Sequence, residues 1–132
     1  GTVNLVRVQN PLAEDEPFLR ASILDTLSRR AEYNLNRMQG DIRLFEVGSV
    51  FAARAGSTPL EEVHVALLVM GKRRPPHFTE PQPPAFDAWD AKEFAQLLME
   101  VAYPQGNVEI EPGKGDVLWY IVNGTARVGR VV

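Results

Sequence analysis

The stretch "IRLFEVGSVF", residues 42–51, carries apolar side chains on both of its alternating faces. The two sets are Ile42, Leu44 and Val50, and Phe45, Val47 and Phe51. Because successive side chains of a strand point to opposite faces, the pattern predicts a strand that is covered on both faces. Glu46 interrupts the run, and it is either a catalytic acid or a structural carboxylate. An unpaired buried carboxylate is costly, so we expect a neighbouring backbone group or basic side chain to satisfy Glu46.

A second strand of the same kind follows after a polar loop. Residues 52–62 contain Gly56 and Pro59 and read as a loop, and "VHVALLVMG", residues 63–71, is again apolar on both faces. The two strands predict a long antiparallel pair. Ahead of them, "TVNLVRV", residues 2–8, alternates and is rich in β-branched residues, which predicts another strand.

Two helices are expected. The first runs from Leu24 to Met38, with Ser22 or Asp25 as its cap and Gly40 as its stop. Its apolar stripe, at spacings of three or four, is Leu24, Leu27, Ala31, Leu35 and Met38. The second begins near Asp90, where Asp90 and Glu93 have capping-box spacing, and ends at Pro104. Its expected buried residues are Phe94, Leu97, Leu98 and Val101.

The rest of the chain completes an α+β class. Residues 72–89 hold five of the ten prolines and predict a surface crossover. Strands are expected at 107–111, 116–122 and 126–132, the last two joined at Asn123-Gly124, a strong hairpin signal. Together the patterns predict an antiparallel sheet of about six strands flanked by two main helices, in one domain spanning residues 1–132. The last residues run out in mid-strand, which we interpret as a piece of a longer multidomain chain.

Composition narrows the class of protein. The 132 residues include no cysteine, which excludes disulfides and thiolate metal sites and favours a reducing, cytoplasmic location. The net charge of -3 argues against strong direct nucleic-acid binding. The longest apolar run, residues 65–71, is too short to cross a bilayer, so no membrane association is expected.

A search for catalytic and metal motifs is negative. The sequence has no glycine-rich phosphate loop, no histidine pair at metal spacing and no serine elbow, so we assign no catalytic and no metal residue. His64 is more consistent with a packed or hydrogen-bonded core histidine than with a ligand. "KRR", residues 72–74, is either a phosphate contact or, as we favour, a solubility patch. Trp89, Trp119 and Tyr120 are expected to be core anchors rather than base-stacking platforms.

The order of several short motifs resembles a known family. "NPLAEDEPFLRASILDTLSRRAEYNLNR", "IRLFEVGSVF", "RRPPHF" and "FDAWDAKEFAQLLMEV" together resemble the beta-chain family of bacterial phenylalanyl-tRNA synthetases. The family's ordered series is N-P-L-S, L-R-x-S-L-L, N-x-x-R and R-L-F-E-x-G-x-V-F. Residues 10–12, 19–24, 34–37 and 43–51 match it. The second half departs: the family's D-L-K-G is Asp90-Ala91-Lys92-Glu93 here, and its histidine-proline-glycine stretch has no counterpart, which leaves the register of residues 104–132 open.

The resemblance implies a class II synthetase-like module without catalysis of its own. In catalytic modules of that class, an arginine after the strand phenylalanine holds the adenylate phosphate, whereas here Ala52 follows Phe51. Arg54, two positions on, is a conceivable replacement. Within the motif, the resemblance marks Glu46, Gly48 and Phe51 as structural positions.

The resemblance also implies partners and cofactors. The module would support subunit assembly of phenylalanine-tRNA ligase by packing against the alpha subunit, in a tetramer of two alpha and two beta chains. The alpha subunit would use ATP and magnesium to join phenylalanine to its tRNA, and this module would bind no cofactor. The helix face carrying Arg30, Tyr33 and Arg37 is the interface candidate. Two alternatives stay open: a stand-alone pseudo-synthetase domain that binds a small metabolite and regulates a partner, and a protein-binding module that offers "RRPPHFTEPQPP" as an extended ligand.

Overall fold

The computed structural model describes residues 6–7 and 18–132, which form two compact units divided between Gly71 and Lys72. The first unit contains β1 (Val6–Arg7), β2 (Phe18–Leu19), α1 (Leu24–Asn36), β3 (Ile42–Ala52) and β4 (Leu60–Met70). The second contains α2 (Ala88–Ala102), β5 (Val108–Pro112), β6 (Trp119–Asn123) and β7 (Ala126–Val131). The α+β class is confirmed. The expectation of one domain over residues 1–132 stays a prediction.

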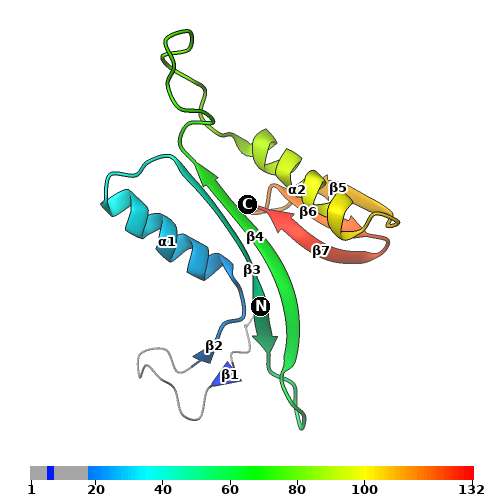
Figure 1. Ribbon diagram of the computed structural model, residues 1–132. Helices are drawn as coiled ribbons and strands as arrows, with labels where there is room; N and C mark the ends of the chain where they lie inside the picture. Colours follow the sequence, from blue (N-terminus) through cyan, green and yellow to red (C-terminus); the bar gives the residue numbers. More distant parts are fainter. Residues whose placement is uncertain (1–5, 8–17) are drawn as a thin grey trace. The chain divides into compact units, whose positions relative to one another are not determined.

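The long antiparallel pair predicted from the opening stretch is confirmed. β3 and β4 each span 11 residues and pair from Ile42 opposite Met70 to Ala52 opposite Leu60 (Figure 1). The connecting loop, residues 53–59, is shorter than expected because both strands extend further toward it. At the other end, Gly71 lies so close to the Gly40 carbonyl and Asp41 that a Cβ atom would overlap them.

Helix α1 covers one face of this hairpin. Its core is Ile23, Leu27, Val50 and Ala66, with Leu24, Leu44 and Leu68 packed against it. The prediction that β3 is covered on both faces is wrong for the described residues: Phe45 and Val47 on the opposite face are exposed. The physical reason is that α1, the helix of the first unit, packs on one face of the hairpin only.

The ends of α1 differ from those expected. No side chain caps its first turn, although the Leu24 amide donates to Ser22 Oγ at 3.2 Å. At the C-terminus, Met38 adopts a φ of 63°, its amide donates to the Leu35 carbonyl and the Gln39 amide donates to the Asn34 carbonyl. Met38 therefore takes the left-handed position that glycine usually fills, and Gly40 is not the stop. Met38 is exposed because the helix ends before it, and Leu35, in the last turn of α1, is exposed as well.

In the second unit, α2 packs on a three-stranded antiparallel sheet of order β5-β6-β7 (Figure 1). The core is Ala95, Ile121 and Val131, with Ala91, Met99, Val108 and Trp119 against it. The predicted hairpin is confirmed, with Asn123 opposite Ala126 and a positive φ at Gly124. Leu97 and Val101, expected in the core, are exposed, because the small residues Ala91 and Ala95 form the face that approaches the sheet.

A single sheet of about six strands is not shown by the described residues. Their strands lie in three separate sheets, β1-β2, β3-β4 and β5-β6-β7. Each of these strands pairs only with a strand that neighbours it in sequence. Residues 72–87, which follow β4 in sequence, are rich in proline, and proline has no amide hydrogen to donate to a strand partner. Of the expected strand at 2–8, Val6–Arg7 is strand, and the remainder lies outside the described residues. Neither α1 nor α2, the helices of this described part, combines the length and apolarity that crossing a bilayer requires.

Candidate subunit interface

Arg20 ties the segment before α1 to the middle of β3. Its Nη1 donates to Glu46 Oε1 at 2.6 Å and its Nε donates to the Ser49 carbonyl at 2.8 Å. The Arg20 carbonyl in turn accepts from the Phe51 amide at 2.9 Å. Glu46 Oε1 is thus paired with a basic side chain, one of the two kinds of partner expected for this carboxylate. This pairing gives Glu46 a structural role in the described chain.

Gly48 provides the space for this arginine. A Cβ atom at Gly48 would overlap the Arg20 guanidinium, and Gly48 has no positive φ. The requirement for glycine is therefore one of close approach rather than of backbone conformation. Arg20 contacts Glu46 and the Phe51 backbone and lies against Gly48. Because Arg20 is far from all three in sequence, the local sequence pattern does not indicate it as their partner.

At the end of β3, the described residues place no arginine at position 52, where a catalytic class II module would hold phosphate. Ala52 is still paired in the strand, opposite Leu60, whereas Arg54 lies in the loop and donates from Nε to the Thr58 carbonyl at 3.0 Å. An open depression of about 340 Å³ lies here, lined by Ala21, Val50, Phe51, Ala52, Ala53, Leu60, Glu62 and His64. Its described lining includes no arginine or lysine. His64 is exposed and bonds to Glu62 at 2.9 Å, so it is hydrogen-bonded but not a core residue.

The predicted interface residues share the outer side of α1. Tyr33 is exposed, and the Arg37 guanidinium lies 4.2 Å from the centre of its ring. Arg30 is also exposed, and its spacing of three and seven residues from Tyr33 and Arg37 places all three on one helix face. Whether this face meets a partner stays a prediction.

A larger apolar surface lies on the hairpin. We call it the hairpin apolar face and define it by Phe45, Val47, Val63 and Val65, which are 59%, 54%, 70% and 45% exposed. Val47 is directly opposite Val65, and Val63 is opposite Ser49, so these side chains lie on the face of the sheet away from α1. Contiguous exposed apolar residues of this kind mark interaction surfaces. The signal in the sequence was the apolar pattern on both strand faces.

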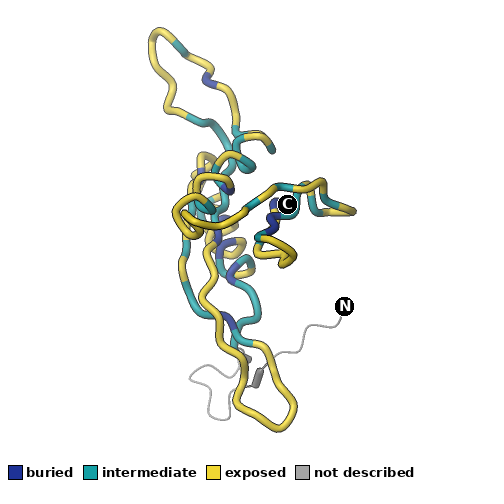
Figure 2. Tube along the Cα trace, turned by 90° about the vertical axis from the view of Figure 1, so that its right-hand side faces the viewer, coloured by how far each residue is buried: buried dark blue, intermediate teal, exposed yellow. Residues whose placement is uncertain are grey.

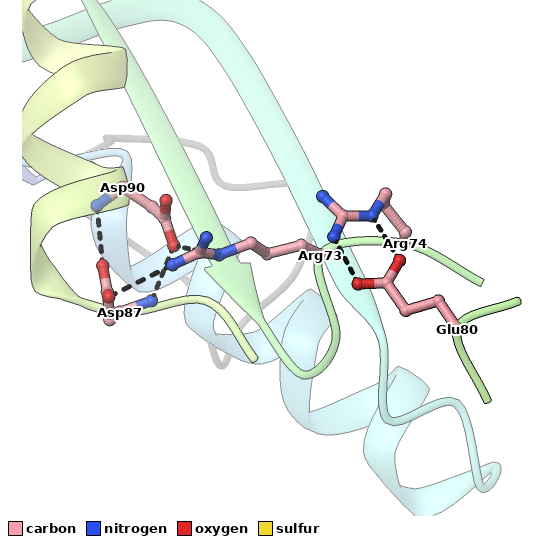
Figure 3. A network of polar contacts seen from close by, with 5 residues as sticks. All are labelled: Arg73, Arg74, Glu80, Asp87 and Asp90. Carbon is pink, nitrogen blue, oxygen red and sulfur yellow. Dashed lines mark hydrogen bonds and ion pairs between the residues drawn. The ribbon is translucent and has the colours of Figure 1, made fainter. Parts of the chain in front are cut away.

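The basic residues at the start of the second unit are neutralised within the chain. Figure 3 shows the Arg73 guanidinium between Asp87 and Asp90, at 3.1 and 2.8 Å, and Arg74 facing Glu80 at 2.7 Å. The Asp90 amide donates to Asp87, which lowers the pKa of the Asp87 carboxyl. The hydrogen bond from Arg74 likewise lowers the pKa of Glu80. These contacts favour a structural role for the two arginines over phosphate binding.

In the second unit, two predictions are wrong: the position of the α2 capping box and the role of Trp89 as a core anchor. The capping box is formed by Asp87 and Asp90 rather than by Asp90 and Glu93, so the helix starts at Ala88. Trp89 is exposed and is not a core anchor. Its ring lies 5.3 Å from that of Trp119, and Lys92 lies 5.2 Å from both ring centres. Among the described residues, no group of His, Asp or Glu is arranged to hold a metal ion.

Comparison with protein families tests the resemblance drawn from the motifs. A family model described as the phenylalanyl tRNA synthetase beta chain CLM domain matches residues 2–128. The chain belongs to this family. A phenylalanine-tRNA ligase beta subunit from Novosphingobium aromaticivorans is 33% identical over 121 residues, which are 91% of this chain and 15% of that protein. The equivalent subunit from Shouchella clausii is 31% identical over 114 residues, 84% of this chain and 14% of the relative.

A shorter match is closer in sequence. The beta subunit of Xanthomonas oryzae is 42% identical over 72 residues, which cover 53% of this chain and 9% of that relative. The chain therefore spans about 15% of the length of the long relatives it matches.

The family motifs acquire a physical meaning in this CLM domain. Arg20 belongs to the L-R-x-S-L-L match, and Glu46 and Gly48 belong to the R-L-F-E-x-G-x-V-F match. The ion pair between Arg20 and Glu46 joins the two motifs in space across 26 residues of sequence. The first motif piece, at residues 10–12, lies outside the described residues.

Proposed function

We propose that this chain is a structural and subunit-assembly module of a phenylalanine-tRNA ligase beta subunit and is non-catalytic by itself. The family match supports a role in that enzyme. Ala52 in place of a phosphate-binding arginine, together with the loop position of Arg54, supports the absence of a catalytic role.

In this proposal the chemistry belongs to the parent complex. The alpha subunit uses ATP and magnesium to attach phenylalanine to its tRNA in the cytoplasm, within a tetramer of two alpha and two beta chains. The CLM domain packs against the alpha subunit. Within the assembled beta chain, it takes a class II synthetase-like fold with a larger antiparallel sheet.

The hairpin apolar face is the observation that carries the assembly role. Its four side chains are each about half exposed or more. Covering their remaining exposed area would contribute roughly 3–7 kcal/mol, since a fully buried side chain of this size contributes about 1.5–3 kcal/mol. Tyr33 and Arg37 on the outer side of α1 add an aromatic and a cation, two side-chain types enriched at interfaces.

The test uses the full-length beta chain co-expressed with its alpha chain. Val63→Asp places a charge on the hairpin apolar face at a site already 70% exposed, and Val101→Asp places the same charge on an exposed residue of α2. We expect Val63→Asp to reduce the alpha chain recovered with beta at least tenfold. We expect Val101→Asp to leave recovery unchanged.

The result that contradicts the proposal is normal assembly of Val63→Asp together with Tyr33→Ala and Arg37→Ala. Amide exchange of residues 42–70 in the same samples separates lost contact from lost folding. The metabolite-binding alternative predicts saturable binding of a small molecule by calorimetry. The open depression at Ala52 offers such a ligand few polar groups among its described lining residues.

A further inference from the structure

The sheet β5-β6-β7 has a second face, opposite to the one on which α2 packs (Figure 1). Ile121 and Val131 belong to the core beneath α2. Because successive side chains of a strand point to opposite faces, Tyr120 lies on the second face. Its cross-strand neighbours are Glu111 on β5 and Arg130 on β7. Directly opposite residues share a face, so one row across the second face runs from a carboxylate through a tyrosine to an arginine.

A β-bulge brings a second arginine to this face. The pairing of β6 with β7 shifts between Ile121 and Val122. Arg127 therefore lies opposite Val122, in the place that Val128 would take in a regular ladder. Without the bulge, Arg127 would point to the face on which α2 packs. The Arg127 guanidinium instead lies 3.9 Å from the centre of the Tyr120 ring, which places it on the second face.

We call the second face the charged sheet face and define it by Glu109, Glu111, Tyr120, Arg127 and Arg130. Glu109, like Arg127, is opposite Val122, so a second row also runs from a carboxylate to an arginine. All four charged residues are exposed, and none forms an ion pair with another described residue. β6 keeps the two carboxylates about 10 Å from the two arginines, measured between the strand backbones. β7 is exposed over most of its length and is buried next to the C-terminus (Figure 2). The face therefore presents an acidic edge and a basic edge that the described residues do not neutralise.

We propose that the charged sheet face is an interface between two copies of the beta chain. When a second copy is related to the first by a twofold axis parallel to the strands, its β7 lies over β5 of the first, and its β5 lies over β7. Glu111 of each copy then faces Arg130 of the other, and Glu109 faces Arg127. Packed sheets lie about 10 Å apart, a gap that an arginine and a facing glutamate bridge together. Tyr120 lies closest to the axis and meets its own equivalent.

The charge pattern selects both the partner and its orientation. A twofold axis running across the strands would place carboxylates opposite carboxylates, and such like-charge contacts are unfavourable. A nucleic acid fits less well, because Glu109 and Glu111 on the same face repel phosphate groups. The ion pairs fix the orientation of the two copies more than they contribute affinity. The inference goes beyond the assembly role, and it rests on the proposed function only in taking the second beta chain from the tetramer.

The first experiment places the photo-crosslinking residue p-benzoylphenylalanine at Tyr120 of the full-length beta chain, co-expressed with its alpha chain. We expect irradiation to give a product with the mass of two beta chains, in which residue 120 is linked to the β5–β7 region. Val101 is the control position, because it is 82% exposed on α2, which packs on the other face of the sheet. The same probe there should give at least tenfold less of this product.

Charge reversal supplies the second measurement. Arg127→Glu combined with Arg130→Glu should lower the yield of the Tyr120 product at least tenfold, because only carboxylates then meet across the interface. Glu109→Arg combined with Glu111→Arg should do the same with only arginines. When the two reversed chains carry different tags and are expressed together, cross-linking between them should return to the level of the parent.

Several outcomes would overturn the proposal: a Tyr120 product chiefly with tRNA or the alpha chain, equal yields from the two probe positions, or reversed chains that do not restore each other. Loss of cross-linking to tRNA in the variant without the two arginines would identify the face as a phosphate contact instead. The assembly role is read separately, from the alpha chain recovered with beta. The charge reversals should leave that recovery unchanged, whereas Val63→Asp lowers it.

Discussion

Replacing Arg20 by alanine should loosen β3 at its centre. The substitution removes the bonds to Glu46 and Ser49 while leaving the backbone bond from Phe51 to residue 20 intact. The Arg20 and Glu46 side chains are 34% and 24% exposed. The cost of breaking this ion pair should therefore lie between the small cost for an exposed pair and the large cost for a buried one. Glu46 Oε2 is buried without a hydrogen-bond partner among the described residues, so Arg20 is the principal compensation for that carboxylate. We expect a loss of about 2 kcal/mol.

Amide hydrogen exchange of residues 42–70 is the assay, because both tryptophans lie in the other unit. A loss of about 2 kcal/mol corresponds to exchange roughly 30-fold faster. Glu46→Ala serves as the second single variant, and the double variant closes the cycle. We expect the double variant to cost about 1–2 kcal/mol less than the sum of the singles. Additivity within about 0.5 kcal/mol would refute the reasoning that this ion pair joins the two motifs.

Three further predictions concern single sites. Gly48→Ala should destabilise the hairpin by about 2 kcal/mol through overlap with the Arg20 guanidinium. When Arg20 is already alanine, the same substitution should cost less than about 1 kcal/mol. Equal costs in the two backgrounds would argue against the overlap. Met38→Gly should stabilise α1 by about 0.5–1 kcal/mol by relieving a left-handed methionine, as measured by amide exchange of the helix, and a loss of that size would contradict this. The pKa of the Asp87 carboxyl is lowered in the folded chain. The contribution of Asp87 to folding stability is therefore present above its unfolded pKa and is lost as the pH falls through its folded pKa, below about pH 4. Asp87→Asn keeps a capping acceptor, so the pH-dependent change in the NMR shift of the Asp90 amide should be clearly smaller in this variant than in the parent, and equal changes would contradict the reasoning.

The local sequence pattern was sufficient to predict the β3–β4 and β6–β7 pairs and to predict that Glu46 has a partner. Two runs of alternating apolar residues predicted the β3–β4 pair, and Asn123-Gly124 predicted the β6–β7 hairpin. The requirement that a carboxylate in an apolar strand be satisfied predicted a partner for Glu46. It did not name Arg20, because a partner distant in sequence is brought close only by folding.

The predictions for α2 were wrong where more than one residue or face was suited to the same role. Asp87 and Asp90 are both good capping residues, and the ion pair between Arg73 and Asp90 accompanies the earlier start of α2. On the same helix, the apolar residues extend around more than one face. Contact with the sheet selected the face with Ala91 and Ala95 and left Leu97 exposed.

The sequence by itself determined the α+β class, the antiparallel β3–β4 pair, the second hairpin and the family, because these depend on side-chain period, turn chemistry and the order of motifs. The tertiary structure decided which apolar faces are covered, which arginine satisfies Glu46 and why residue 48 is glycine. The physical reason is that burial and ion pairing depend on distances between segments. Periodicity limits which faces are able to pack, but only the folded chain determines which of them meet.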